Sequence, residues 1–232
     1  MTTDTMIPLT LPPATTTTDQ VFEALYAAVI SLRLPPGTKV SEADIARRLD
    51  VSRQPVRDAF FRLSKLGFLS IRPQRATLVT RISPRAVLDA VFVRSALEME
   101  CIARVCDRID AGGIAELTAT LEAQHTALDS ENADAFHAED DRFHQTLCRL
   151  AGHAHVWDII QEQKAHMDRV RFLTLSRTRR RQVLHEHGEI MKTIEMRDPD
   201  RSRALLGAHI RSVEPALEAM REQRSDCFED GA

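Results

Sequence analysis

One carboxylate and three imidazoles are the side chains in this sequence best suited to hold a metal ion. Asp140 and His144 are four residues apart in a segment with helical spacing of apolar residues, so they share one helix face. His187 and His209 fall in two later helical segments. Three nitrogens and one oxygen from three helices are enough ligands for a divalent metal. A single histidine on a helix is more often an ordinary surface or core residue, and spacing alone does not show that the four converge.

A second residue with chemical potential is Arg94, which lies in a segment that is apolar on nearly every side. Such a helix is buried, and a buried arginine needs an anion. Glu98, one turn later, could be that anion. Alternatively, Arg94 faces a metal cavity and holds a ligand carboxylate through two hydrogen bonds. Arg169 and Arg171 could add polar groups to such a cavity, whereas the run Arg179-Arg-Arg181 is expected to be a solvated helix start.

The elements that must position these residues read as helices throughout the second part of the chain. Beyond Ser83-Pro84, apolar residues recur at helical spacing and no alternating strand pattern appears. We expect helices at 84–109, 113–130, 133–151, 154–175, 177–197 and 199–222. Six helices in about 140 residues predict a compact antiparallel bundle. The bundle would span residues 83–222 and be followed by a tail, 223–232.

A different chemistry is indicated by the stretch Val51-Ser-Arg-Gln-Pro-Val-Arg57. Ser52 is suited to cap a helix whose apolar face continues with Val56, Ala59, Phe60, Leu63 and Leu66. A shorter helix ending at Asp50 precedes it, as in a helix-turn-helix that offers side chains to the DNA major groove. Arginine binds guanine there and glutamine can pair with adenine, which makes base readers of Arg53, Gln54 and Arg57. The alternative is a capped surface helix with solvated charges.

The surroundings of this stretch favour DNA binding. A first helix capped by Thr18 ends before Leu34-Pro-Pro-Gly37, and Ser41 caps the second helix. Two β-rich pieces, 68–71 and 77–79, predict a hairpin with a basic tip, from which Gln74 and Arg75 could reach DNA. Three helices and a hairpin make a winged helix-turn-helix over residues 18–82. Residues 1–17 are rich in Thr and Pro, and we expect them to be disordered.

Charge and composition agree with this division. The 232 residues carry a net charge of −3. Residues 18–82 hold 11 Lys/Arg against 6 Asp/Glu, and residues from 83 onward hold 20 against 27. A basic first part and an acidic second part suggest that only the first meets a polyanion. No apolar run is long enough to span a membrane and no signal pattern appears, so we expect a cytoplasmic protein with four reduced, mostly buried cysteines.

The first part resembles the DNA-binding domain of GntR-family transcription regulators. The resemblance rests on Leu34-Pro-Pro-Gly-Thr-Lys-Val-Ser-Glu42, on Val51-Ser-Arg-Gln-Pro-Val-Arg-Asp-Ala59 and on Arg72-Pro-Gln-Arg75. It implies that Ser52, Arg53, Gln54, Arg57, Gln74 and Arg75 form the DNA-binding set. There are two departures: Ala43 stands where the family often has a DNA-contacting Arg, and Ala76 where the wing usually has Gly.

The second part resembles the FCD ligand-binding domain of the FadR subgroup of these regulators, over residues 84 to about 222. Asp140-x-x-Phe143-His144 is followed by Glu186-His187, and then, at intervals of eleven residues, by Asp198 and His209. The resemblance implies metal binding by Asp140, His144, His187 and His209, and it favours effector binding by Arg94. It gives no ligand role to His137, His153 or His185.

Together these patterns predict a metabolite-responsive DNA-binding regulator. Its expected partners are a short palindromic operator, a second copy of the chain and a small carboxylate. The metal would be Zn²⁺, with Ni²⁺ or Mn²⁺ as alternatives. We expect a repressor rather than an enzyme, since no G-x-S-x-G, P-loop, dinucleotide fingerprint or H-E-x-x-H is present. Two alternatives stay open: a metal-dependent enzyme acting on a small carboxylic acid, and a constitutive DNA-binding protein whose metal is structural.

Overall fold

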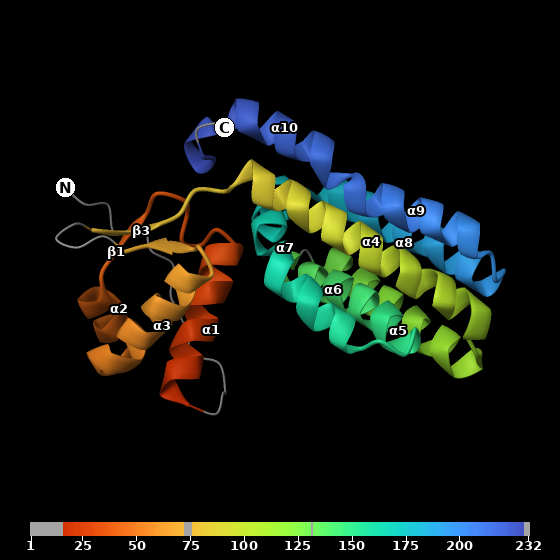
Figure 1. The fold of residues 1–232 in the computed structure, drawn as a ribbon, viewed down its shortest axis with the longest axis horizontal. Helices are drawn as coiled ribbons and strands as arrows, with labels where there is room; N and C mark the ends of the chain where they lie inside the picture. Colours follow the sequence, from red (N-terminus) through yellow and green to blue (C-terminus); the bar gives the residue numbers. More distant parts are fainter. Residues whose placement is uncertain (1–15, 72–75, 131, 230–232) are drawn as a thin grey trace. The chain divides into compact units, whose positions relative to one another are not determined.

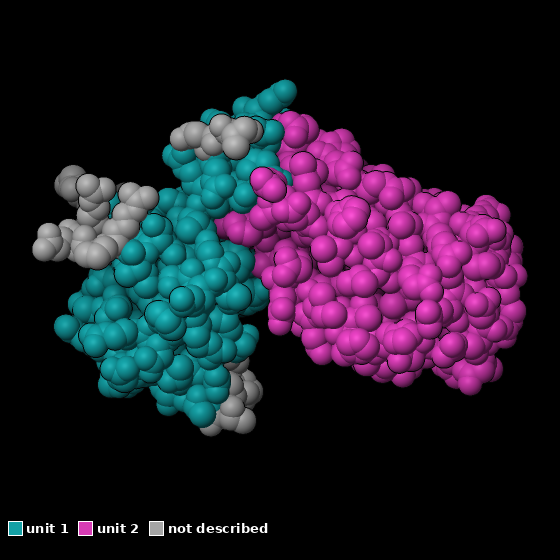
Figure 2. Space-filling model, viewed as in Figure 1, with its two compact units in different colours: residues 1–84, 220–232 teal, residues 85–219 magenta. Residues whose placement is uncertain are grey.

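The structure is a computed structural model that describes residues 16–71, 76–130 and 132–229. It divides into two compact units (Figure 2). The first takes the described residues up to 84 together with those from 220 onward, and the second takes residues 85–219. The predicted fold class, mainly α with an N-terminal winged helix-turn-helix and an all-helical second domain, is confirmed.

The first unit contains three helices and a small sheet (Figure 1). Its elements are α1 Thr17–Ile30, β1 Lys39–Val40, α2 Glu42–Leu49, α3 Arg53–Lys65, β2 Leu69–Ser70 and β3 Thr77–Val79. The strands are antiparallel in the order β1-β3-β2, with Lys39 opposite Leu78. Strand β1 was not predicted, because two residues are too few to show alternation. Apolar side chains of all three helices form the core, among them Val21, Leu25, Ile45, Val56, Phe60 and Leu63.

The helix starts in this unit differ in detail from the expectation. The hydroxyl of Thr16, not of Thr18, caps α1 by accepting from the backbone N–H of Asp19. The expected disorder of residues 1–17 therefore does not extend to Thr16 and Thr17, and the rest of that segment lies outside the described residues. Ser41 caps α2 as predicted.

Ser52 occupies the predicted N-cap position of α3, but its hydroxyl makes no capping hydrogen bond within the described part of the chain. The extended backbone at Ser52 supplies the turn between α2 and α3 without that bond. Leu66, expected on the buried face, is 43% exposed and lies at the C-cap, one residue after α3 ends at Lys65. Ser52 itself is exposed at the start of α3.

The second part of the chain is a bundle in which α4 to α9 lie side by side (Figure 1). Its helices are α4 Pro84–Arg108, α5 Ala111–Asp129, α6 Ala133–Leu150, α7 His155–Thr174, α8 Arg177–Glu195, α9 Pro199–Arg211 and α10 Val213–Gln223. The expected helix at 199–222 is therefore two helices. Pro215 has no N–H for the carbonyl of Arg211, and its ring would clash with that carbonyl, so α9 ends at Arg211.

The chain after α10 folds back into the first unit. A short 3₁₀ helix, η1 Ser225–Cys227, precedes a bridge between Ile82 and Phe228. The N–H of Ile82 donates to the carbonyl of Cys227 at 2.8 Å, and the N–H of Glu229 donates to the carbonyl of Ile82 at 3.0 Å. Ile82 and Phe228 are both buried. Within the expected tail, 223–232, Cys227 and Phe228 are thus buried in the first unit, whereas residues 223–226 and 229 are exposed.

Two further expectations concern the whole chain. All four cysteines are free thiols and buried, as predicted. No helix in the described ranges is long and apolar enough to cross a bilayer.

Candidate functional site

The four candidate metal ligands converge in the interior of the helical unit. Asp140 and His144 come from α6, His187 from α8 and His209 from α9, and all four are buried. Their ligand atoms all lie within 4.8 Å of one another. His187 Nε2 lies 3.2 Å from His209 Nε2 and 3.7 Å from Asp140 Oδ1. Ligand atoms held about 2.1 Å from one ion have separations of this order.

The hydrogen bonds of the three imidazoles determine which nitrogen is free. His144 Nδ1 lies 2.6 Å from Glu98 Oε2, and His209 Nδ1 lies 2.7 Å from Glu186 Oε2. A carboxylate only accepts, so each Nδ1 carries the proton and each Nε2 carries a lone pair. His187 Nδ1 is bonded in the same way to Gln124 Oε1 at 2.9 Å. Metal-binding histidines are oriented by partners of this kind.

The unprotonated ring nitrogens are buried acceptors without donors in the described ranges, and a cation would stabilise them. His144 Nε2 is buried and has no hydrogen-bond partner among the described residues. The Nε2 atoms of His187 and His209 turn lone pairs toward each other at 3.2 Å. Buried acceptors without donors cost free energy. The residues present therefore fit a divalent cation.

The protonation states also suit a metal. Burial and the neighbouring His209 hold the pKa of His187 well below its usual range, and burial lowers the pKa of His209. Burial alone would raise the pKa of Asp140, but Arg171 and the histidines outweigh it and hold that pKa well below its usual range. Metal binding requires neutral imidazoles and an ionised carboxylate, which these environments favour.

Arg94 pairs with Glu98 and also lines a cavity. Arg94 Nε donates to Glu98 Oε1 at 2.6 Å, so Glu98 is its buried counterion. Arg94 Nη2 is buried and has no partner in the described residues, and Nη1 approaches only Met167 Sδ, at 3.9 Å. Burial opposes ionisation of Glu98, but Arg94 and His144 lower its pKa to about 2. One edge of the guanidinium is therefore neutralised and the other is open.

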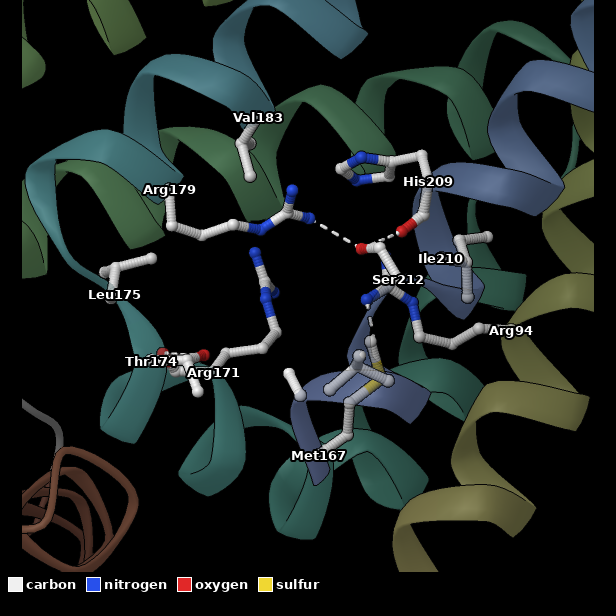
Figure 3. A pocket seen from close by; sticks show the side chains of 12 residues that line it. Arg94, Met167, Arg171, Thr174, Leu175, Arg179, Val183, His209, Ile210 and Ser212 are labelled. Atoms are coloured by element: carbon white, nitrogen blue, oxygen red, sulfur yellow. Dashed lines mark hydrogen bonds between the residues drawn. The ribbon is translucent and has the colours of Figure 1, made fainter. Parts of the chain in front are cut away.

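The open edge of Arg94 faces a cavity next to the metal ligands (Figure 3). Figure 3 shows the side chains of Arg94, Arg171 and Arg179 pointing into it from three helices. The lining residues are Arg94, Met167, Arg171, Thr174, Leu175, Arg179, Val183, His209, Ile210, Ser212, Val213 and Ala216. His209 belongs to this wall and to the metal cluster, so a molecule in the cavity would lie beside the ion.

The other arginines are placed differently from the expectation. Arg171 lines the cavity and is paired with Asp140, whereas Arg169 is fully buried and is not part of the lining. The run from Arg179 was expected to be solvated. That was wrong for Arg179, which lines the cavity, and for Arg180, which is buried; Arg181 is exposed. Arg179 lies seven residues before Glu186, two turns along one face of α8, and that spacing could have indicated their pairing.

The histidines that received no ligand role lie apart from the four ligands. His185 is exposed, and His153 contacts Arg104. His137 faces Asp168 at 3.6 Å in a second buried group that includes Asp141. Lys164 donates to both carboxylates of that group and Arg171 pairs with both as well, so two cations already face its two negative charges.

The predicted DNA-contacting residues lie together at the start of α3. Ser52, Arg53, Gln54 and Arg57 are all exposed. Gln54 Nε2 donates to Asp58 at 2.9 Å, and Arg57 lies 3.4 Å from Glu42, with its side chain 62% exposed. These weak surface contacts are easily exchanged for contacts with DNA. Gln74 and Arg75 lie outside the described residues.

Three residues that bond to the candidate metal ligands were not predicted in that role: Glu98 and Glu186, which bind imidazole, and Gln124. Gln124 also approaches Asp140, with Nε2 3.5 Å from Oδ1. In the sequence, Glu186 stands out only as the neighbour of His187. Gln124 gives no signal in the sequence, because it lies on α5 and meets its partners only through helix packing.

Comparison with known proteins identifies the family of this chain. Residues 17–79 match the gntR family of bacterial regulatory proteins, and residues 89–212 match the FCD domain. The chain is 31% identical to the HTH-type transcriptional repressor RspR of Escherichia coli over 221 residues, which cover 95% of this chain and 97% of RspR. It is 27% identical to a probable D-xylose utilization operon transcriptional repressor of Paenarthrobacter nicotinovorans, over 87% and 89% of the two chains.

Solved structures share the fold. E. coli McbR/YncC superimposes with a TM-score of 0.75 at 19% identity, covering 89% of this chain and 99% of that one. A putative GntR regulator from Rhodococcus sp. RHA1 gives a TM-score of 0.71 at 21% identity, covering 88% and 99%. The family matches and the identity to RspR lead to one conclusion: the chain belongs to the GntR family of bacterial transcription regulators, with an FCD domain, and is not an enzyme.

Proposed function

We propose that this regulator is a repressor that leaves its operator when a small carboxylate binds beside a divalent metal in the FCD domain. Two relatives, RspR and the probable D-xylose operon regulator, are named as repressors, which supports this direction of control. The observation that carries the metal is the arrangement of the imidazoles. Three Nδ1 atoms are bonded to Glu98, Gln124 and Glu186, and the remaining ring nitrogens face one another and Asp140.

The ligand set narrows the choice of metal. Asp140, His144, His187 and His209 offer one oxygen and three nitrogens, which suits Zn²⁺ and also Ni²⁺ or Mn²⁺. When bound, the ion would supply a positive centre for an anionic oxygen of the effector. Arg94, which lines the cavity and whose Nη2 has no partner among the described residues, would hold the same carboxylate or another part of the molecule.

For operator binding, we propose that the chain recognises a short DNA palindrome as a homodimer. One winged helix-turn-helix reads only a few base pairs, and two-fold symmetry doubles the site. Arg53, Gln54 and Arg57 would contact bases or nearby phosphates from α3. Release by an inducer requires that the effector bind the DNA-free form more tightly than the DNA-bound form.

A metal and DNA-binding experiment on the full chain tests this function. Metal content is measured by elemental analysis, and a duplex selected from a random library serves as operator in fluorescence anisotropy. We expect about one divalent ion per chain, and release of DNA by at least one small carboxylate only while the ion is present. His187→Ala should lose both properties. His185→Ala, an exposed histidine two residues away, is the matched control and should keep them.

The outcomes separate the alternatives. A protein purified without metal, and unable to take it up, would contradict the proposed site. Bound metal with DNA binding that no carboxylate changes would favour a structural metal in a constitutive DNA-binding protein.

A further inference from the structure

The cavity in the FCD domain is lined by guanidinium groups. Three arginines line it, and no aspartate or glutamate does among the residues that the structure describes. The carboxylates lie behind the arginines and connect them to the metal ligands. Arg94 reaches His144 through Glu98, and Arg179 reaches His209 through Glu186. The cavity wall thus presents guanidinium groups fixed from behind, a surface suited to anions.

Arg179 is held in place from two sides. Its Nη1 donates to Glu186 Oε1 at 2.9 Å, and its Nη2 donates to Ser212 Oγ at 2.6 Å. Ser212 in turn donates to the carbonyl of His209 at 2.6 Å. Each Nη atom carries two hydrogens, so Nη1 keeps one beyond its bond to Glu186. The side chain is 24% exposed and lines the cavity.

Arg94 and Arg179 enter the cavity from different helices, α4 and α8, and from opposite sides in Figure 3. The rest of the lining is largely apolar and includes Met167, Leu175, Val183, Ile210, Val213 and Ala216. A ligand that uses this wall fully therefore has a short carbon skeleton and an anionic group at each end.

We infer that Arg179 is a specificity-determining residue that binds a second anionic group of the effector, so that the effector is a short dicarboxylate rather than a monocarboxylate. This inference rests on the proposed function, because the first carboxylate is placed beside Arg94 and the ion. Arg171 is less suited to this role, because two carboxylates, of Asp140 and Asp168, already pair with its guanidinium, whereas Arg179 pairs with the carboxylate of Glu186.

Matched acids test the inference by calorimetry on the metal-loaded full chain. The pairs are lactate with malate and glycerate with tartrate. In each pair the second acid carries a carboxylate in place of one hydrogen of the first. A charge-assisted hydrogen bond to carboxylate corresponds to about a tenfold to hundredfold change in affinity. We expect the dicarboxylate of at least one pair to bind tighter by this factor. Arg179→Gln should remove that advantage and leave the monocarboxylate affinity unchanged.

Two further variants make the result interpretable. Arg181→Gln changes an exposed arginine in the same turn of α8 and should behave as wild type. Arg179→Lys keeps the charge but loses the planar fork, and it should retain part of the preference even if Arg179→Gln folds poorly. Metal content is measured for each variant.

Different failures have different meanings. Equal binding of mono- and dicarboxylates that Arg179→Gln leaves unchanged overturns the inference and leaves the proposed function standing. Equal weakening of both acids with loss of metal also overturns it, because Arg179 would then act only by positioning Glu186. If no acid of either kind binds the metal-loaded protein, both proposals fail.

Discussion

His187 Nε2 and His209 Nε2 lie 3.2 Å apart, although the Nδ1 atom of each ring is already bonded to an oxygen of another side chain. Two neutral imidazoles arranged in this way turn lone pairs toward each other. A cation between them would convert this unfavourable contact into two coordination bonds. The partners that fix the rings, Gln124 and Glu186, are therefore as relevant to the metal as the ligands themselves.

The first prediction concerns Gln124. Gln124→Leu removes the oxygen that fixes the tautomer of His187 and should lower metal affinity about tenfold to hundredfold. Competition with a chelating indicator measures the change. Gln163→Leu, at an exposed position of α7, is the control and should leave the affinity as it is. Wild-type affinity in Gln124→Leu would contradict the tautomer assignment.

The second prediction concerns the recognition helix. Arg53→Ala or Arg57→Ala should each weaken operator binding by about 1–3 kcal/mol if the arginine grips a base. The measurement is a gel-shift titration at fixed salt, because phosphate contacts depend strongly on ionic strength. Arg85→Ala, on exposed α4 surface of the other unit, serves as control. If both α3 variants bind as well as wild type, the assignment of the recognition helix is wrong.

The third prediction is a pH dependence of stability. Burial, together with the nearby charge of Arg169, lowers the pKa of His166 to about 4. The unfolded chain takes up this proton near pH 6.5 and the folded chain does not, so stability falls as pH drops from 6.5 toward 4. Between pH 7 and pH 5, His166 should account for a loss of about 1–2 kcal/mol.

Denaturant unfolding of chelated protein at the two pH values checks this. The pH-dependent loss should be smaller by that amount in His166→Gln. His155→Gln, at an exposed position, should lose as much as wild type. An identical loss in His166→Gln and wild type would mean that His166 does not titrate below its usual pKa.

The fourth prediction concerns the C-terminal segment. Phe228 is 2% exposed and its neighbours pair with the backbone of Ile82. Phe228→Ala should destabilise the first unit by about 3–5 kcal/mol through the cavity it leaves. Phe61→Ala, which removes a ring that is 59% exposed in the same unit, should cost far less. Thermal unfolding compares the two, and equal small effects would show that the segment is not packed as described.

Short-range sequence patterns predicted the helices and the residue types of the sites. Apolar periodicity placed the helices of the second part to within a few residues, because burial of one face is repeated at every turn. The cap at Ser41 and the exposed Arg53, Gln54 and Arg57 follow from the same short-range rules. The break at Ser212 was also encoded locally, in Pro215, although spacing alone suggested one continuous helix.

Which helix faces meet depends on how the helices pack, and short-range patterns do not specify it. Periodicity shows that Asp140 and His144 share a face, but not that this face points to His187 and His209 across helix boundaries. For the same reason, spacing did not indicate that Gln124 contacts His187, and it predicted a solvated Arg179. The physical reason is that a helix face is specified by residues a few positions apart, whereas its partner is selected by the packing of the whole core.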